Sequence, residues 1–156
     1  MIADFFSVSN RSRLREVSSS WVGTPFHSHG AVKGRGVSCI FLIEEILIEV
    51  GAIERGEFKL PHGLISWGRH NEESLIEGFM IEPEVRKHLR RVDIEEGIAP
   101  GDIVPMRIER TIHHLGLAID GTHLIHCHRK KGVMIDSFED VRPFLTQSIY
   151  RLKKIS

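Results

Sequence analysis

Apolar side chains in the middle of the first half of the chain recur every three or four residues, which is the spacing of one face of an α-helix. The members of this stripe are Cys39, Leu42, Ile43, Ile46 and Val50. The intervening glutamates fall outside the stripe. We therefore predict a helix over residues 40–50. Cys39 lies at its N-terminus, and Gly51 is the residue that ends it.

Other segments in the first part of the chain read as helices joined by loops. Proline at a first helical position and asparagine at a cap both favour a helix start, and Pro83 and Asn71 stand at such places. The predicted helices cover residues 10–20, 71–79 and 83–91. Residues 52–70 contain several glycines and a proline, and we predict a loop there.

The pattern changes after Pro100-Gly101, where short β-branched runs alternate with turn signals. The predicted strands cover residues 102–108, 112–119, 123–128, 132–135 and 149–153. The Asp120-Gly121 pair predicts a tight hairpin between the second and third of these strands. Helices followed by antiparallel strands predict an α+β fold. We find no internal repeat and expect residues 1–156 to form a single domain.

Composition and charge narrow the functional classes. The chain has 156 residues, of which 41% are hydrophobic, and 21 basic residues balance 21 acidic ones. This balance gives no reason to expect a nucleic acid or an anionic membrane as a partner. The N-terminal segment lacks the pattern of a signal peptide, and no apolar run has the length of a membrane span. We expect a cytoplasmic protein by default, which lysis or a phage particle would have to deliver elsewhere.

Cys39 is the residue that most strongly suggests chemistry. It follows the glycine-rich loop of residues 34–38 and starts the predicted helix, where backbone N–H groups and the helix dipole favour a thiolate. A helix-start cysteine with histidines far downstream is the arrangement of a thiol nucleophile and its base. The alternative is that Cys39 is a small buried hydrophobic residue, as free cysteines often are.

Five of the ten histidines lie between His113 and His128. Strand alternation places His114 on one face with Gly116 and Ala118, and the hairpin brings His126 beside His114. The two small residues leave room for another element, for which we expect the Cys39 helix. Thiol, imidazole and second imidazole would then serve as nucleophile, base and orienting group.

The neighbouring residues have simpler explanations. We expect His113 and His123 to lie at the surface or to be held by structural partners, and Cys127 to be a buried small side chain. His126 and His128 form a His-x-His pair that could bind zinc or copper, but no carboxylate partner is evident from the sequence.

The order and spacing of five segments, from about Trp21 to the C-terminus, resemble the NlpC-type cell-wall cysteine peptidases. The segments are Trp21-Val22-Gly23-Thr24-Pro25-Phe26, Gly36-Val37-Ser38-Cys39, Gly101-Asp102-Ile103-Val104, His114-Leu115-Gly116-Leu117-Ala118-Ile119 and Leu124-Ile125-His126. The resemblance is strongest to phage-associated members. It implies a papain-like fold, with N-terminal helices packed on an antiparallel sheet. It also implies a reaction that requires no cofactor or metal. It also implies that Cys39 is the nucleophile, His114 the base and His126 the third polar residue.

The chain departs from the family pattern beside the nucleophile. Ser38 stands where the family usually has an aspartate that holds the free amine of the peptide stem, and Phe26 replaces a tyrosine of the same pocket. Phe41 occupies a position where glycine is usual, and we expect it to crowd the first helical turn. We interpret this as a retained reaction with an altered substrate pocket in which Phe26 and Ser38 contact the substrate.

Three functions are consistent with these observations. The first is a cysteine amidase or endopeptidase that acts on peptidoglycan stem peptides or related γ-glutamyl amides. The second is a thiol acyltransferase or deacylase that uses the same residues on a lipid or a small amide. The third is a non-catalytic wall- or phage-tail-associated module whose pocket Ile40 and Phe41 block.

Overall fold

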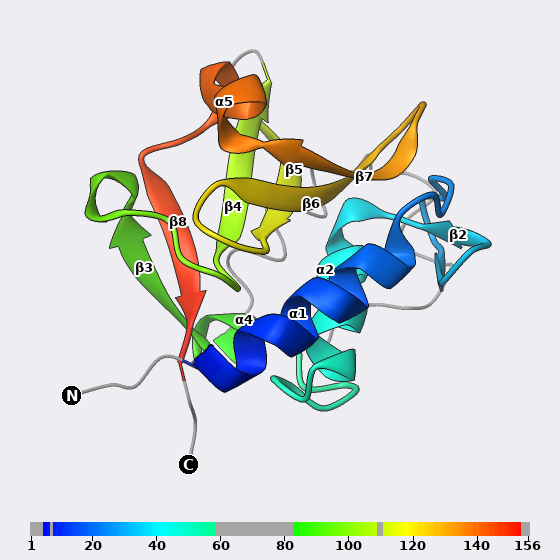
Figure 1. Cartoon of the computed structure of the whole chain (residues 1–156), viewed down its shortest axis with the longest axis horizontal. Helices are drawn as coiled ribbons and strands as arrows, with labels where there is room; N and C mark the ends of the chain where they lie inside the picture. The colour runs from blue at the N-terminus through cyan, green and yellow to red at the C-terminus, as the bar shows by residue number, and fades with distance from the viewer. Residues whose placement is uncertain (1–4, 7, 59–82, 109–110, 154–156) are drawn as a thin grey trace.

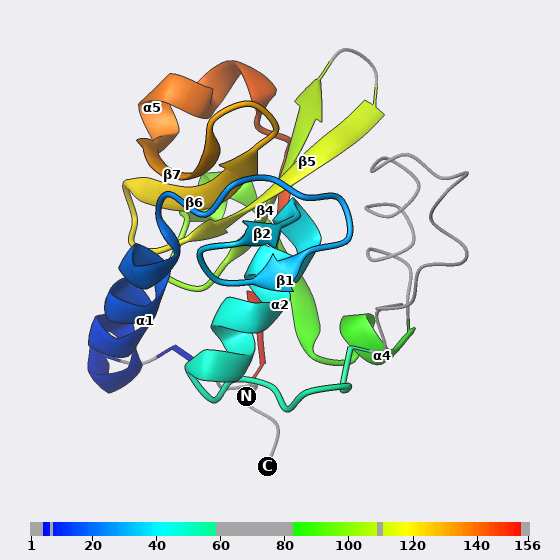
Figure 2. The same cartoon turned by 90° about the vertical axis from the view of Figure 1, so that its right-hand side faces the viewer.

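The computed structural model describes residues 5–6, 8–58, 83–108 and 111–153. Two helices, α1 (Val8–Trp21) and α2 (Cys39–Glu49), lie side by side (Figures 1 and 2). Helix α1 buries Leu14, Val17 and Trp21, which lie three and four residues apart and so share one face. The predictions of helices over 10–20 and 40–50 are confirmed.

The second half of the chain forms an antiparallel sheet of six strands in the order β3-β8-β4-β5-β6-β7. The strands are β3 (Leu89–Asp93), β4 (Ile103–Ile108), β5 (Thr111–Ala118), β6 (His123–His128), β7 (Gly132–Ser137) and β8 (Ser148–Leu152). Shorter elements complete the described chain: β1 (Ala31–Val32), β2 (Gly36–Val37), α4 (Pro83–Arg86), η2 (Ile94–Glu96), α5 (Phe138–Val141) and η3 (Arg142–Phe144). The predicted α+β class and the predicted hairpin of β5 and β6 are confirmed.

The sheet carries apolar side chains on both faces, and each face has its own cover. Helices α1 and α2 pack on one face, in a core that includes Leu115, Leu117 and Ile125. Helix α5 lies on the other side of the sheet (Figure 1), where Val141 packs with Leu124. Strands β5 and β6 are therefore buried between two layers.

Two predictions about this architecture are wrong. The predicted helix over 83–91 ends at Arg86, and residues 89–93 form strand β3, because all five pair with β8 and tertiary pairing outweighs the local helical spacing. Helix α2 also does not pack over Gly116 and Ala118. A methyl group on Gly116 would lie 2.5 Å from Leu124 Cδ1, so the space left by this glycine is already filled from β6. The predicted helix over 71–79 lies outside the described residues.

Within the described part of the chain, no helix is both long and apolar enough to cross a membrane.

Candidate active site

Cys39 is the first residue of α2, and Ser38 is the residue that starts the helix. The extended backbone of Ser38, with φ −95° and ψ 169°, lets its hydroxyl accept a hydrogen bond from the Phe41 N–H at 3.4 Å. This is the geometry of an N-cap, for which serine is among the best residues. Cys39 is fully buried, and Phe41 packs in the main core. The crowding of the first turn by Phe41 stays a prediction.

The segment before the nucleophile helix is tied to the sheet and folded tightly on itself. The Val133 N–H donates a hydrogen bond to the Thr24 carbonyl, and the Gly23 N–H donates one to the Val133 carbonyl. A side chain on Gly132 would lie 2.5 Å from the Thr24 carbonyl oxygen. Glycine at 132, with φ of 78°, is therefore needed for both space and backbone conformation. These contacts fix the chain that leads to Phe26.

Phe26 lies beside the start of α2 and beside the turn between β6 and β7. Its backbone forms an isolated parallel β-bridge with Val37, two residues before Cys39. The Arg129 guanidinium carbon lies 5.7 Å from the centroid of the Phe26 ring. Cys127, buried on β6, donates its thiol hydrogen to the Val37 carbonyl at 3.2 Å. Residues from β6 thus hold the loop that ends at the candidate nucleophile.

The structure brings the two predicted histidines together. His114 on β5 and His126 on β6 are joined by a hydrogen bond of 2.8 Å between His114 Nε2 and His126 Nδ1. His126 is 6% exposed, whereas His114 is half-buried. The other ring nitrogen of His126, Nε2, lies 2.7 Å from the Asp136 carboxylate on β7.

Asp136 is the residue that sequence reasoning missed. The predicted strand stopped at residue 135, one position before it, whereas β7 continues to Ser137. Met134 pairs with His126 in the register of β6 and β7, so Asp136 is the next residue on the same face of β7. Extending the alternation of Val133 and Ile135 by one residue is the signal that could have found it.

The protonation state of His114 follows from its surroundings. Burial, and to a smaller extent the electrostatic influence of His126, His128 and Arg129, lowers the pKa of His114 from 6.5 to about 3. The neutral imidazole is therefore the stable form of His114 near pH 7. A preformed thiolate–imidazolium pair would need the protonated form, so the structure favours His114 as a neutral base.

Two further histidines of this region, His123 and His128, have structural partners. His128 Nδ1 accepts hydrogen bonds from the backbone N–H groups of Lys130 and Lys131, and His123 lies 3.3 Å from Asp120. The side chain of His113 lies outside the described residues. Among the described residues, no group of three or more histidine, cysteine, aspartate or glutamate side chains is placed to hold a metal ion.

The four other candidate residues therefore fall into two groups. His126 contacts it directly, while Ser38, Cys39 and Phe26 gather at the start of α2, which packs on β5 and β6. The face of β5 that α2 covers is the one of Leu115 and Leu117, so the argument that placed the thiol over Gly116 fails. The pairing of Cys39 with His114 stays a prediction from the family resemblance.

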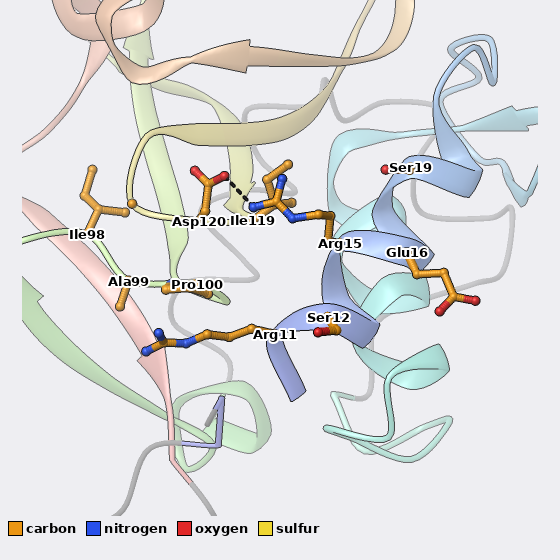
Figure 3. Close-up of a pocket in the computed structure, with 11 residues that line it drawn as sticks. Arg11, Ser12, Arg15, Glu16, Ser19, Ile98, Ala99, Pro100, Ile119 and Asp120 are labelled. Atoms are coloured by element: carbon orange, nitrogen blue, oxygen red, sulfur yellow. Dashed lines mark hydrogen bonds and ion pairs between the residues drawn. The ribbon is translucent and has the colours of Figure 1, made fainter. Parts of the chain in front are cut away.

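A hollow lies away from these residues, between α1 and the turns before β4 and after β5. Figure 3 shows Arg15 of α1 reaching Asp120, and these two side chains form an ion pair of 2.8 Å. Asp120 follows the end of β5, whereas His114 lies in the first half of that strand. The hollow is therefore not part of the candidate site.

The sequence matches no protein-family model and no curated protein. Solved structures do resemble the fold. The NlpC/p60 domain of the peptidoglycan hydrolase SagA aligns with a TM-score of 0.54 at 12% identity, over 92% of this chain and 98% of that domain. An NLP/P60-family protein similar to a lipoprotein, from Staphylococcus aureus subsp. aureus Mu50, aligns with a TM-score of 0.63 at 14% identity, over 99% of this chain.

A third structure, an NlpC/P60 family protein from Bacillus cereus ATCC 10987, aligns with a TM-score of 0.60 at 16% identity over 94% of this chain. The chain spans 44% of the Staphylococcus protein and 40% of the Bacillus protein, but nearly all of the SagA domain. At identities this low, the structural likeness establishes the fold alone. The predicted resemblance to NlpC-type proteins and the papain-like fold are confirmed, and the likeness to phage-associated members stays a prediction.

Proposed function

We propose that this chain is a cysteine amidase or endopeptidase that acts on peptidoglycan stem peptides or related γ-glutamyl amides. The observation that carries the proposal is the 2.8 Å hydrogen bond between His114 and His126, on two strands against which the Cys39 helix packs. These are the residues that the family resemblance implies as base and third polar residue. The NlpC/P60 fold supports the same class of reaction.

In the proposed reaction, Cys39 Sγ attacks the amide carbonyl while His114 Nδ1 takes the thiol proton. The neutral state of His114 suits this role, because a neutral imidazole can accept the proton as the S–C bond forms. Backbone N–H groups at the start of α2 stabilise the oxyanion. His114 then gives the proton to the leaving amine, which leaves a thioester on Cys39.

The second half of the reaction returns the enzyme to its starting state. His114 takes a proton from a water molecule, whose oxygen attacks the thioester carbonyl. The carboxylic acid leaves and the thiol of Cys39 regains a proton. Neither half requires a redox step or an added group.

In the proposed enzyme, the substrate binds around Phe26 and Ser38. Ser38 is buried and uses its hydroxyl to cap α2, so it offers no negative charge to a free amine. Arg129, stacked near Phe26, adds a positive charge to the same region. We therefore propose that substrates without a free N-terminal amine are preferred.

One observation favours the non-catalytic alternative: the Cys39 side chain is fully buried, as is expected of a packing residue. Alkylation of Cys39 by iodoacetamide across pH, in wild type and His114→Gln, separates the two functions. If the chain is a cysteine hydrolase, Cys39 should react with iodoacetamide. The dependence of its alkylation rate on pH should then change when His114 is replaced. A thiol whose profile is the same in both proteins would contradict the pairing.

The activity itself is tested with synthetic stem peptides that contain the L-Ala-γ-D-Glu amide, with free and acetylated N-termini. Cleavage by wild type that is lost in His114→Ala and retained in His128→Ala supports the proposal. The His128 variant is the matched control, because it removes a neighbouring imidazole whose Nδ1 accepts hydrogen bonds from backbone N–H groups of its own turn. Cleavage that survives in His114→Ala would exclude His114 as the base.

A further inference from the structure

Strands β5, β6 and β7 hold three polar side chains in one hydrogen-bonded line. His114 Nε2 lies 2.8 Å from His126 Nδ1, and His126 Nε2 lies 2.7 Å from Asp136 Oδ2. The central ring is almost completely buried, and the Asp136 side chain is 23% exposed. The line therefore begins at a carboxylate near the surface and ends at the half-buried ring of the candidate base.

The carboxylate gives this line a direction. An ionised carboxylate can only accept hydrogen bonds, so His126 Nε2 must carry a hydrogen and donate it to Asp136. In neutral His126 the other nitrogen, Nδ1, then has a lone pair and accepts from His114 Nε2–H. His114 Nδ1 is left without a hydrogen.

A second imidazole alone could not set this direction. The neutral ring of His126 can present either a donor or an acceptor to His114, and the choice depends on what its far nitrogen contacts. If His126 Nδ1 carried the hydrogen, His114 would be protonated on Nδ1 and could not take a proton from a thiol there. The group on the far side of His126 therefore decides whether His114 can act as a base.

We propose that Asp136 is a positioning residue that fixes His126 and His114 in their Nε2–H tautomers, so that His114 Nδ1 is free to accept a proton. The role of that proton acceptance in catalysis rests on the proposed function. The tautomer assignment does not, because it follows from Asp136, His126 and His114 alone. Asp136 also supplies the negative charge that a histidine lacks as a third residue.

The test compares Asp136→Asn and Asp136→Leu with wild type by long-range 1H–15N NMR of histidine-labelled protein. Asn keeps the shape but can donate to His126 Nε2 and reverse the line, whereas Leu removes the acceptor altogether. Asp140→Asn, on an exposed side chain of α5, is the control for loss of one negative charge. Spectra of His114→Gln and His126→Gln assign the two rings.

We expect wild type and Asp140→Asn to show both rings protonated on Nε2, and at least one Asp136 variant to shift His114 toward the Nδ1–H form. The proposal is overturned if His114 carries its hydrogen on Nδ1 in wild type, or if both Asp136 variants keep the wild-type tautomers.

Kinetics on the cleaved peptide add a second readout. The variant that shifts the tautomer should lose about tenfold or more in kcat with KM within about twofold, because proton transfer and not substrate binding is impaired. An unchanged kcat with a shifted tautomer would also overturn the positioning role. If no peptide is cleaved by wild type, the proposed function fails, while the NMR result still decides the role of Asp136 in the line.

Discussion

Replacing His114 with glutamine should remove part of the acid sensitivity of folding. Burial lowers the pKa of His114 to about 3 in the folded protein, against 6.5 for the ordinary side chain. Between these two values the unfolded chain binds a proton that the folded protein does not, so stability rises with pH. Acidification from pH 7 toward pH 3 must therefore destabilise wild type through this one group.

The size of the effect follows from the two pKa values. A histidine with a pKa of 6.5 when unfolded and about 3 when folded loses about 2 kcal/mol of folding free energy between pH 7 and pH 5. Glutamine does not titrate, but its amide can still meet His126. We therefore expect wild type to lose about 2 kcal/mol more than His114→Gln over this interval.

Urea unfolding at pH 7, 6 and 5 measures these differences, provided that the m-value stays constant. Leu117→Val is the control: it weakens the same strand without removing a titrating group and should keep the wild-type pH dependence. Equal losses in wild type and His114→Gln would refute the reasoning, because the folded protein would then take up the same protons as the unfolded chain.

Three further predictions concern the thiol, the pocket and the core. Cys39→Ala should abolish peptide cleavage with little loss of stability by urea unfolding, whereas Cys127→Ala should keep most of the activity; cleavage by Cys39→Ala would exclude the nucleophile. Ser38→Asp, which can still cap α2, should shift kcat/KM toward the free-amine peptide by about tenfold, or 1.4 kcal/mol; a wild type that already prefers the free amine would contradict this. Arg151→Met should cost about 3 kcal/mol in unfolding free energy, because it leaves the fully buried Asp102 carboxylate without its cation; a loss under 1 kcal/mol would show that other contacts suffice.

The sequence predicts an element well when its own pattern agrees with its packing. The helix at Cys39 combines a capping serine, an apolar stripe and a terminal glycine, and the β5–β6 hairpin combines alternation with an Asp-Gly turn. Strand β3 was missed because its two most apolar positions, Leu89 and Val92, are three apart, as on a helix. Its strand conformation comes from pairing with β8, some sixty residues away in the chain, which no local pattern contains.

The candidate site shows the same division between local and long-range information. The pair of His114 and His126 could be predicted, since one hairpin carries both residues. The side of the sheet that α2 covers could not be predicted. The space beside Gly116 is filled by Leu124 from β6, and no local pattern at Gly116 indicates this. Asp136 was missed because the end of a strand is decided by its partner's register, here that of β6.

The hydrogen bond from Cys127 to the Val37 carbonyl joins residues that are 90 positions apart in the chain. Contacts of this kind form only after a long loop has closed, and they make folding slow compared with helical bundles of similar size. The start of α2 can therefore reach its final position only after strand β6 has been made and has paired. During synthesis the thiol of Cys39 would emerge long before the residues that bury it, so a nascent chain should carry an accessible thiol that the finished fold conceals.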